Sequence, residues 1–410
     1  MIKIVRAEEF RRKIVSSPDV SKVVAEILED VRLRGDAAVK EYEERFDRVK
    51  LETLELAAHT PAVSTEYLRM LERAAENIRA FHEKQRHEGF MFTPRDGVLL
   101  GQRVIPLDTV GVYVPGGTAA YPSSVLMNVI PAVVAGCRRI VVATPPRVRP
   151  EIVAAAKIAG ASQVFQMGGA QAVAAMAFGT ESVPKVDKIT GPGNIYVAEA
   201  KRQVFGRVGI DMVAGPSEIL IIADKDNNPV HLAADMLAQA EHDKLASAVL
   251  ITDSADLAEK VKSEVERQLQ ALPREEIARE AIENNSAIIL VENLNDAAKI
   301  ADDFAPEHLE LCVAEPFGFM TRIHNAGSIF LGKNSPEALG DYYAGANHVL
   351  PTMGTARFSS PLSVDDFVKK TQYIAYSHDA LMQSAGDIEA FAMSEGLQGH
   401  ARSITVRRHD

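Results

Sequence analysis

The sequence predicts an α/β protein, and three features of the 410-residue chain support this class. Short runs rich in β-branched residues alternate with helical segments from residue 97 onward, which is typical of βαβ units and a mostly parallel sheet. Glycine and proline cluster at 114–117 and 214–216, where the chain can cross between two lobes. The length is about two to three times that of a typical domain. We therefore predict two Rossmann-like lobes, a helical N-terminal region and a C-terminal helical tail.

The N-terminal region has the pattern of a helical scaffold. Residues 20–46 carry apolar side chains at helical spacing, with a break at Gly35. Ser64 is placed as the N-cap of a long amphipathic helix that runs to about residue 87. The tail from Ser377 onward is again helical in pattern.

Strands are expected wherever short β-rich runs follow a turn signal. Three such runs, 98–100, 104–106 and 111–114, come first. Seven more strands alternate with helices, at 140–143, 163–166, 188–190, 218–223, 248–252, 287–291 and 328–331. We divide the chain into an N-terminal arm (1–15), a first α/β lobe with the helical region (16–110 and 219–362), a second α/β lobe (111–218) and a C-terminal tail domain (363–410).

Composition and charge exclude several classes of function. The net charge of −11, from 45 basic and 56 acidic residues, disfavours nucleic-acid binding, which depends on clustered Lys and Arg. The longest mostly apolar run, 125–137, is too short for a membrane helix, and the N-terminus lacks the pattern of a signal peptide. Cys137 and Cys312 are too few for a disulfide framework and are expected to be buried packing residues. We expect a cytoplasmic protein.

One candidate phosphate site is the segment Gly-Pro-Gly-Asn at 191–194, which follows an expected strand and opens a helix. Tyr196 stands where a dinucleotide fingerprint needs a third glycine, and Asp211 is only loosely at the distance of a ribose-binding acid. Taken locally, a tight turn fits as well as a nucleotide site.

Histidines mark further candidates. His82 and His87 are five residues apart, which places them on different sides of a helix, so a metalloprotease motif is rejected in favour of a solvated face. Gln239 and His242 share one helix face and could bind one metal, although such pairs are usually surface residues. His400 is a further possible ligand, or a satisfied surface group.

Two polar segments could carry chemistry. Glu307 and His308 lie just before a strand-like run, and they combine a water-activating acid with an imidazole suited to proton transfer near neutral pH. The loop at 340–348 holds Asp341 and His348, which suit metal or substrate binding. Judged alone, each is more readily an ordinary polar group.

Taken together, these residues resemble the histidinol dehydrogenase family over almost the whole chain. The matching strings, in chain order, are Gly-Val-Tyr-Val-Pro-Gly-Gly (111–117), Gly-Gly-Ala-Gln-Ala (168–172), Gly-Pro-Gly-Asn-Ile-Tyr-Val (191–197), Ala-Gly-Pro-Ser-Glu (214–218), Gln-Ala-Glu-His-Asp (239–243), Pro-Glu-His-Leu-Glu (306–310), Pro-Glu-Ala-Leu-Gly-Asp (336–341), Asn-His-Val-Leu-Pro-Thr (347–352), Ala-Arg-Phe-Ser-Ser (356–360), and Glu-Gly-Leu (395–397) with His400. Departures are small: Ser335, Ala346 and Gly399 stand where Thr, Pro and Ala are common, and no proposed ligand is lost.

The resemblance implies a homodimeric enzyme with one zinc ion per subunit that oxidises L-histidinol to L-histidine in two NAD-dependent steps through the aldehyde. Its zinc orients the imidazole and amine of the substrate. His308 is implied as the base of both oxidations, and Glu307 as the group that activates water. The other implied roles are Gln239, His242, Asp341 and His400 as zinc ligands; Tyr113, Gln171 and Asn194 at NAD in the second lobe; and Ser217, Gln239, His242, His308, Asp341, His348, Glu395 and His400 at the substrate. The C-terminal tail, with Glu395 and His400, is implied to reach the partner's site.

Three alternatives stay open from the sequence. A relative with the same fold and chemistry could oxidise another alcohol, such as a sulfonated diol. A zinc hydrolase could use Glu307 as the base for a metal-bound water and would need no nucleotide. A non-catalytic scaffold would leave the acid–base pair and the ligand set without a purpose.

Overall fold

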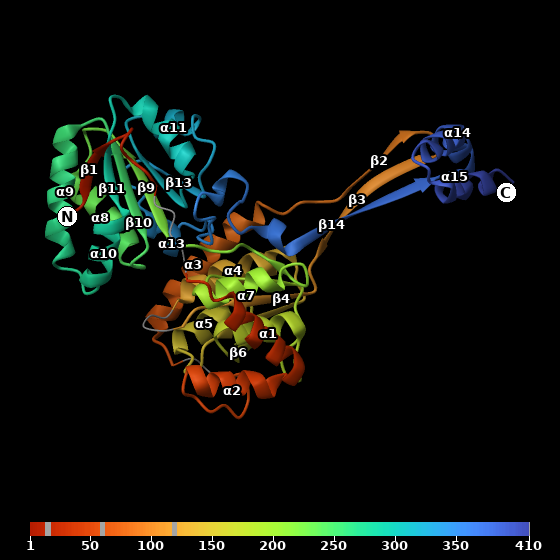
Figure 1. The fold of residues 1–410 in the computed structure, drawn as a ribbon, viewed down its shortest axis with the longest axis horizontal. Coiled ribbons are helices and arrows are strands. Elements are labelled where there is room, and N and C mark those ends of the chain that lie inside the picture. Colours follow the sequence, from red (N-terminus) through yellow and green to blue (C-terminus); the bar gives the residue numbers. More distant parts are fainter. Residues whose placement is uncertain (13–17, 58–61, 117–120, 410) are drawn as a thin grey trace. The chain divides into compact units, whose positions relative to one another are not determined.

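The computed structural model describes residues 1–12, 18–57, 62–116 and 121–409 (Figure 1). The chain divides into two compact units, Met1–Gln85 with Leu107–Phe367, and Arg86–Pro106 with Val368–Asp410. The larger unit contains two parallel sheets with their helices, which we call the first lobe and the second lobe in keeping with the expectation from sequence. The other is called the small unit. The α/β class with mostly parallel sheets is confirmed.

Among the described residues, the first lobe has a parallel sheet of six strands. Along β9, Ile219 and Ile221 pack on one face of this sheet, and Leu220 and Ile222 pack on the other. Burial on both faces explains why these strands are continuous apolar runs. The sheet order is β1 (Lys3–Arg6), β11 (Ala287–Leu290), β10 (Ser247–Thr252), β9 (Glu218–Ala223), β12 (His308–Cys312) and β13 (Ser328–Leu331).

Helices cover both faces of this sheet (Figure 1). The helices of the first lobe are α8 (Pro229–Ala240), α9 (Ala255–Leu269), α10 (Glu275–Asn285), α11 (Leu294–Phe304), α12 (Pro316–Met320) and α13 (Glu337–Tyr342), with the 3-10 turns η1 (Thr355–Arg357) and η2 (Val364–Phe367) following in the chain. The first residues of the chain, expected as an arm, instead add β1 to the sheet edge, parallel to β11.

The second lobe has a smaller parallel sheet in the order β6 (Gln163–Gln166), β5 (Arg139–Thr144), β4 (Thr109–Tyr113), β7 (Lys188–Thr190) and β8 (Gly209–Ile210). Its helices are α4 (Pro122–Ala135), α5 (Pro150–Ala159), α6 (Gly169–Phe178) and α7 (Ile195–Val204). The N-terminal helices α1 (Ser21–Arg34) and α2 (Asp36–Phe46) share a core with α6, and α3 (Thr65–Glu83) shares one with α4 and α5. Our division by sequence grouped residues 16–110 with the first lobe, whereas the apolar faces of these helices pack on the second.

The small unit is an antiparallel sheet followed by helices. The strands β2 (Phe90–Arg95), β3 (Val98–Pro106) and β14 (Val368–Tyr376) pair in the order β14-β3-β2, and α14 (His378–Ser394), α15 (Gln398–Thr405) and the turn η3 (Val406–His409) follow. The sequence indicated the helical tail and two short runs within β3. It did not indicate β14, because the side chains of this strand are mostly exposed and lack an apolar alternation.

Local signals in the N-terminal helices are confirmed, with one exception. Gly35 separates α1 from α2 at φ 57, in the left-handed region that favours glycine. Ser64 caps α3, since its Oγ accepts from the Tyr67 N–H at 3.1 Å. The expectation that His82 lies on a solvated face is wrong, because its side chain is fully buried. Its Nδ1 lies 2.6 Å from Gln85 Oε1, and its Nε2 lies 3.2 Å from Asn347 Nδ2.

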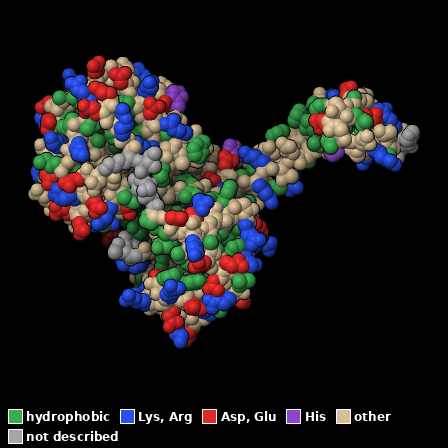
Figure 2. Space-filling view, viewed as in Figure 1, with side chains coloured by type: hydrophobic (Ala, Val, Ile, Leu, Met, Phe, Trp, Pro, Cys, Tyr) green, Lys and Arg blue, Asp and Glu red, His purple; other side chains and the backbone are tan. Residues whose placement is uncertain are grey.

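Both cysteines are free, as expected. The expectation that both are buried is confirmed for Cys312 but is wrong for Cys137, which is only half-buried. None of the helices in the described ranges is long and apolar enough to cross a bilayer. Lys and Arg side chains are interspersed with Asp and Glu over the face of the larger unit drawn in Figure 2.

Candidate active site

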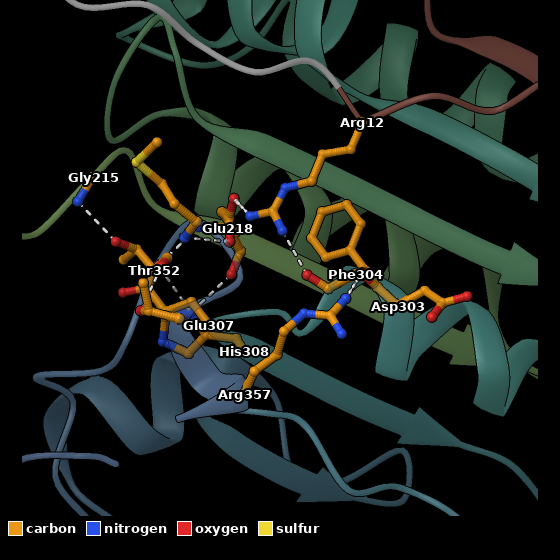
Figure 3. A network of polar contacts seen from close by, with 11 residues as sticks. Arg12, Gly215, Glu218, Asp303, Phe304, Glu307, His308, Thr352 and Arg357 are labelled. Atoms are coloured by element: carbon orange, nitrogen blue, oxygen red, sulfur yellow. Dashed lines mark hydrogen bonds and ion pairs between the residues drawn. The ribbon is translucent and has the colours of Figure 1, made fainter. Parts of the chain in front are cut away.

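Glu307 and His308 lie at the amino end of β12, beside the start of β9 (Figure 3). The Glu218 N–H donates to Glu307 Oε2 at 2.8 Å, and His308 Nδ1 lies 3.1 Å from the Glu218 carbonyl oxygen. The two catalytic candidates therefore share one backbone anchor. In such folds ligands usually bind at the carboxyl ends of strands. In the first lobe the polar groups gather at the opposite edge.

Burial sets the charge states of this pair. Both side chains are buried. Loss of water raises the pKa of Glu307 well above its ordinary value and lowers the pKa of His308 to about 4. The His308 ring is therefore neutral near pH 7. Because Nδ1 faces a carbonyl oxygen it carries the hydrogen, and Nε2 has a free lone pair with no hydrogen-bond partner among the described residues.

Side chains able to bind a metal converge beside His308 Nε2. Asp341 Oδ1 lies 3.8 Å from this nitrogen, and Glu337 Oε1 lies 4.0 Å from it. His242, Glu337 and Asp341 can each direct a ligand atom to one place, with these atoms within 4.8 Å of one another. The Gln239 amide joins them: with its nitrogen toward Glu337 it donates to Oε2 at 2.6 Å, while its oxygen accepts from the Glu218 N–H at 3.0 Å.

The chemistry of this cluster fits a divalent cation. Imidazole, amide and carboxylate groups are ligands of zinc and of related ions. Gln239 lies in the last turn of α8 and Asp341 in the last turn of α13. Helix C-termini carry partial negative charge and so favour a cation. Glu337 is buried, and burial raises its pKa well above the ordinary value, so a bound cation would offset the cost of ionising this carboxyl.

A cavity of about 200 Å³ opens beside the pair and is lined by His308, Asp341 and His348, among others. His348 Nε2 is buried without a hydrogen-bond partner in the described part of the chain, and burial lowers the pKa of its ring. The cavity therefore presents two neutral imidazoles and one carboxylate. Ser217 is the residue before β9 and precedes Glu218 in the chain. Its backbone oxygen accepts from the Ser247 N–H at 3.0 Å.

The three residues implied for NAD lie in the second lobe, at or after the carboxyl ends of strands. Tyr113 ends β4, and its hydroxyl accepts from the Gly169 N–H at 3.2 Å. Gln171 lies in the first turn of α6 and donates to Glu43 Oε1 at 2.9 Å. Asn194 caps α7 by accepting from the N–H groups of Tyr196 and Val197. Helix N-termini at this edge suit an anionic ligand.

Asp211 holds the loop at 191–194 in place. Its Oδ2 accepts from the Gly191 N–H at 2.8 Å, and its other oxygen forms a buried ion pair with Lys201. Lys201 Nζ also donates to the Gly191 carbonyl oxygen at 2.9 Å. Gly191 is required here, because it has φ +107 and a Cβ would lie 2.0 Å from the Tyr113 carbonyl oxygen. Asp211 is thus engaged within the protein and is not placed as a free ribose-binding acid.

Comparison with known proteins identifies the family. The model of the histidinol dehydrogenase family matches residues 10–408. The chain is 54% identical to the histidinol dehydrogenase of Geobacillus kaustophilus over 97% of this chain and 96% of that one, and 51% identical to that of Geobacter sulfurreducens over 98% and 95%. The crystal structure of histidinol dehydrogenase from Elizabethkingia anophelis matches with a TM-score of 0.94 and 35% identity over 100% of this chain and 98% of that one.

The chain belongs to the histidinol dehydrogenase family. It is an oxidoreductase by that membership, and the zinc hydrolase and scaffold alternatives are set aside. The resemblance drawn from sequence motifs is confirmed at the level of the family.

Within this histidinol dehydrogenase chain, the expected site residues are only partly brought together. Glu307, His308, Gln239, His242, Asp341 and His348 meet in the first lobe and its cavity. His400, in α15, and Glu395, at the C-cap of α14, are exposed side chains of the small unit. Their roles stay predictions.

Sequence reasoning missed Glu337, Glu218 and Glu43. Glu337 lies one helical turn before Asp341, and this i, i+4 spacing was a signal that could have found it. Glu218 contributes its backbone, which no residue pattern reveals. Glu43 is buried on α2 and accepts from Gln171 Nε2 and the Gly168 N–H, a contact across more than 120 residues of chain.

Proposed function

We propose that this chain is a cytoplasmic enzyme that oxidises L-histidinol to L-histidine through L-histidinaldehyde, with NAD as oxidant and one zinc ion per subunit. One observation carries the proposal. In a chain of this family, a neutral buried imidazole and a buried carboxyl, His308 and Glu307, lie against a set of metal-binding groups at one sheet edge.

Substrate orientation is assigned to the ligand set. Gln239, His242 and Asp341, with His400, would hold zinc, which when bound fixes the imidazole and amine of histidinol in place. The cavity lined by His348 and Asp341 offers polar contacts to the same groups. Ser217 lies at the amino end of β9, where its hydroxyl can bind substrate.

The first oxidation uses the free lone pair of His308. Its Nε2 accepts the hydroxyl proton as the carbinol carbon gives a hydride to NAD, so the alcohol becomes the aldehyde with one NADH and one proton released. The low pKa of the buried ring leaves Nε2 unprotonated near pH 7, so its lone pair is available, although the ring is a weaker base than an ordinary imidazole. Burial of the pair also excludes bulk water from the reacting carbon.

The second oxidation requires water. Glu307, in its ionised form, takes a proton from a water molecule as the water oxygen adds to the aldehyde carbon, and then passes this proton to the former carbonyl oxygen, giving the hydrated aldehyde. His308 then accepts a proton from one of its hydroxyls as the second hydride leaves to a second NAD, and histidine forms. No thiol is needed: burial raises the pKa of Cys312 to about 12, so this cysteine is not a thiolate near pH 7.

The cofactor is assigned to the carboxyl edge of the second lobe. Tyr113, Gln171 and Asn194 supply side chains there, and the N-termini of α6 and α7 favour the pyrophosphate. Hydride transfer then requires that the nicotinamide ring of NAD reaches the first-lobe cavity.

One assay tests the reaction and the substrate. Metal-loaded protein is supplied with L-histidinol and NAD, and NADH and histidine are both followed. Two NADH per histidine supports the proposal. Turnover of another alcohol, such as a sulfonated diol, with no NADH from histidinol would replace the substrate and keep the chemistry.

We further propose a homodimer in which the small unit of each chain supplies Glu395 and His400 to its partner. Both side chains are exposed, and they lie among large exposed apolar residues of the same segment, Phe391 (70% exposed), Met393 (52%) and Leu397 (42%). Such residues gather where another surface covers them. Hydrophobic side chains reach the surface of the small unit in Figure 2.

Mixing two inactive variants tests this arrangement. His308→Asn and His400→Asn chains are co-expressed with different tags, and the mixed dimer is isolated. If His400 acts on the partner, the mixed dimer has one intact site and about half the wild-type activity per dimer. If His400 acts on its own chain, the mixed dimer has no intact site and stays inactive, which contradicts the exchange.

A further inference from the structure

The Glu218 backbone contacts the side chains of Glu307 and His308, and the Glu218 side chain is itself bound by other residues. The Glu218 carboxylate forms an ion pair with Arg12 and accepts from the Met353 N–H at 3.2 Å (Figure 3). It is only 8% exposed. The residue that fixes the Glu307 carboxylate and the His308 tautomer is therefore itself fixed at its far end.

Arg12 also holds the chain just before the catalytic pair. Its Nη1 donates to the Phe304 carbonyl oxygen at 2.5 Å, and its guanidinium stacks over the Phe304 ring at 4.3 Å. Phe304 ends α11, and Ala305 turns the chain at φ 48 into Pro306 and Glu307. One guanidinium thus joins the end of α11 to the start of β9. These are the two segments whose spacing sets where Glu307 and His308 lie.

We propose that the Arg12–Glu218 ion pair is a positioning device for the catalytic pair. Arg12 holds the Glu218 backbone at the spacing at which its N–H binds Glu307 and its carbonyl oxygen binds the Nδ1–H of His308. Because Nδ1 carries the hydrogen, Nε2 is the nitrogen that can act as the base. Neither Arg12 nor the Glu218 carboxylate reaches the cavity lined by His308, so both act through the pair.

Geometry distinguishes this from an ordinary surface ion pair. Exposed ion pairs contribute little to stability, because water and salt screen them. Arg12 is 27% exposed, and its planar group binds three things at once: a carboxylate, a carbonyl oxygen and a ring face. Loss of the hydrogen-bond partners that orient metal-ligating histidines typically lowers activity by about 10–100-fold, and by analogy we expect an effect of this size from the loss of Arg12.

The test compares Arg12 with a matched arginine elsewhere in the first lobe. Arg279, on α10, is 31% exposed, pairs with Glu266 and Glu275, and does not line the cavity beside His308. We expect Arg12→Ala to lower kcat by about 10–100-fold with KM for histidinol changed less. Arg12→Lys should recover part of kcat, and Glu218→Gln should resemble Arg12→Ala. Arg279→Ala should leave kcat unchanged, with thermal midpoints and bound metal measured for every variant.

The positioning role rests on the proposed function, and the kcat comparison depends on turnover of histidinol. A spectroscopic measurement on the resting protein does not need substrate. In resting protein, the ¹⁵N chemical shifts of the His308 ring, assigned by their loss in His308→Asn, report which nitrogen carries the hydrogen. Wild type should show the Nδ1–H form, and Arg12→Ala a mixture of the two forms. An unchanged tautomer in folded Arg12→Ala, or an equal fall in kcat in Arg279→Ala, overturns the positioning role. Failure of wild type to oxidise histidinol would instead refute the proposed function.

Discussion

The first and second lobes share one architecture but present opposite sheet edges to their sites. In the first lobe, polar groups gather at the amino edge of the strands, where α8 and α13 end. In the second lobe, Tyr113, Gln171 and Asn194 lie at the carboxyl edge, where α6 and α7 begin. Because helix ends carry opposite partial charges, the first edge favours a cation and the second an anion. This matches the proposed division into a zinc site and a pyrophosphate site.

The two sites also differ in what they are made of. The first-lobe site consists of buried ionisable side chains, including Glu307, His308 and Glu337. The second-lobe site relies on helix N-termini and on a glycine loop, with the Glu43 carboxyl beneath it. Side-chain substitutions should therefore have large effects on chemistry in the first lobe and smaller effects in the second.

The largest effect is expected for His308→Asn. Asn cannot accept a proton, so the first hydride transfer should slow by about 10²–10⁴-fold, the range for a general base. Stopped-flow measurement of NADH formed from histidinol checks this. His324→Asn is the matched control, since His324 is an exposed histidine of the same lobe paired with Asp302. A variant that retains more than a tenth of the wild-type rate would contradict the assignment.

Glu307→Gln should separate the two oxidations. Gln keeps an oxygen that accepts from the Glu218 N–H but cannot take a proton from water. We expect oxidation of supplied histidinaldehyde to fall by about 10²-fold, and oxidation of histidinol to the aldehyde to change little. Each half-reaction is measured by NADH formation in single turnovers. Equal losses in the two half-reactions would refute the separate roles of Glu307 and His308.

Glu337→Gln should weaken metal binding by about 10–100-fold, whether Glu337 is a ligand or supports Gln239. Competition with a chromophoric chelator measures the affinity, and full chelation of the wild type should abolish turnover. Glu43→Gln, an equally buried carboxyl of the second lobe, is the control and should bind metal as the wild type does. Unchanged affinity in Glu337→Gln would show that this carboxyl is not part of the metal site.

Much of the fold followed from sequence because its signals are local. The strands of both lobes are short apolar runs between turns, and four of them, at 163–166, 188–190, 218–223 and 328–331, have the predicted bounds. The packing partner of a helix is not a local property, so α1, α2 and α3 were grouped with the wrong sheet. The strand β14 was missed because its pairing with β3, not its own pattern, makes it a strand.

The site divides in the same way. Motifs singled out Gln239, His242, Asp341, Glu307 and His308, and the structure brings them together. The family resemblance was needed to assign them to a site, because each of these residue types is also common as an ordinary polar group on a protein surface. Arg12, Glu218 and Glu43 could not be found, because they act through backbone groups and through contacts between residues far apart in the chain.

The smallest predicted effect concerns stability and Glu43. Burial, and to a smaller extent the neighbouring Asp47, raises the pKa of Glu43 from 4.5 to about 7. As the pH rises from 4.5 to about 7, the unfolded chain releases this proton before the folded chain does. Wild type therefore loses stability relative to Glu43→Gln, by at most about 1.4 kcal/mol per pH unit. Thermal midpoints of both proteins across this range measure the difference. Glu264→Gln, which removes a partly exposed carboxyl whose pKa is lowered by Arg267, should run parallel to wild type there. If the Glu43→Gln curve also runs parallel to wild type, the buried carboxyl does not titrate between pH 4.5 and about 7, and the raised pKa of Glu43 is refuted.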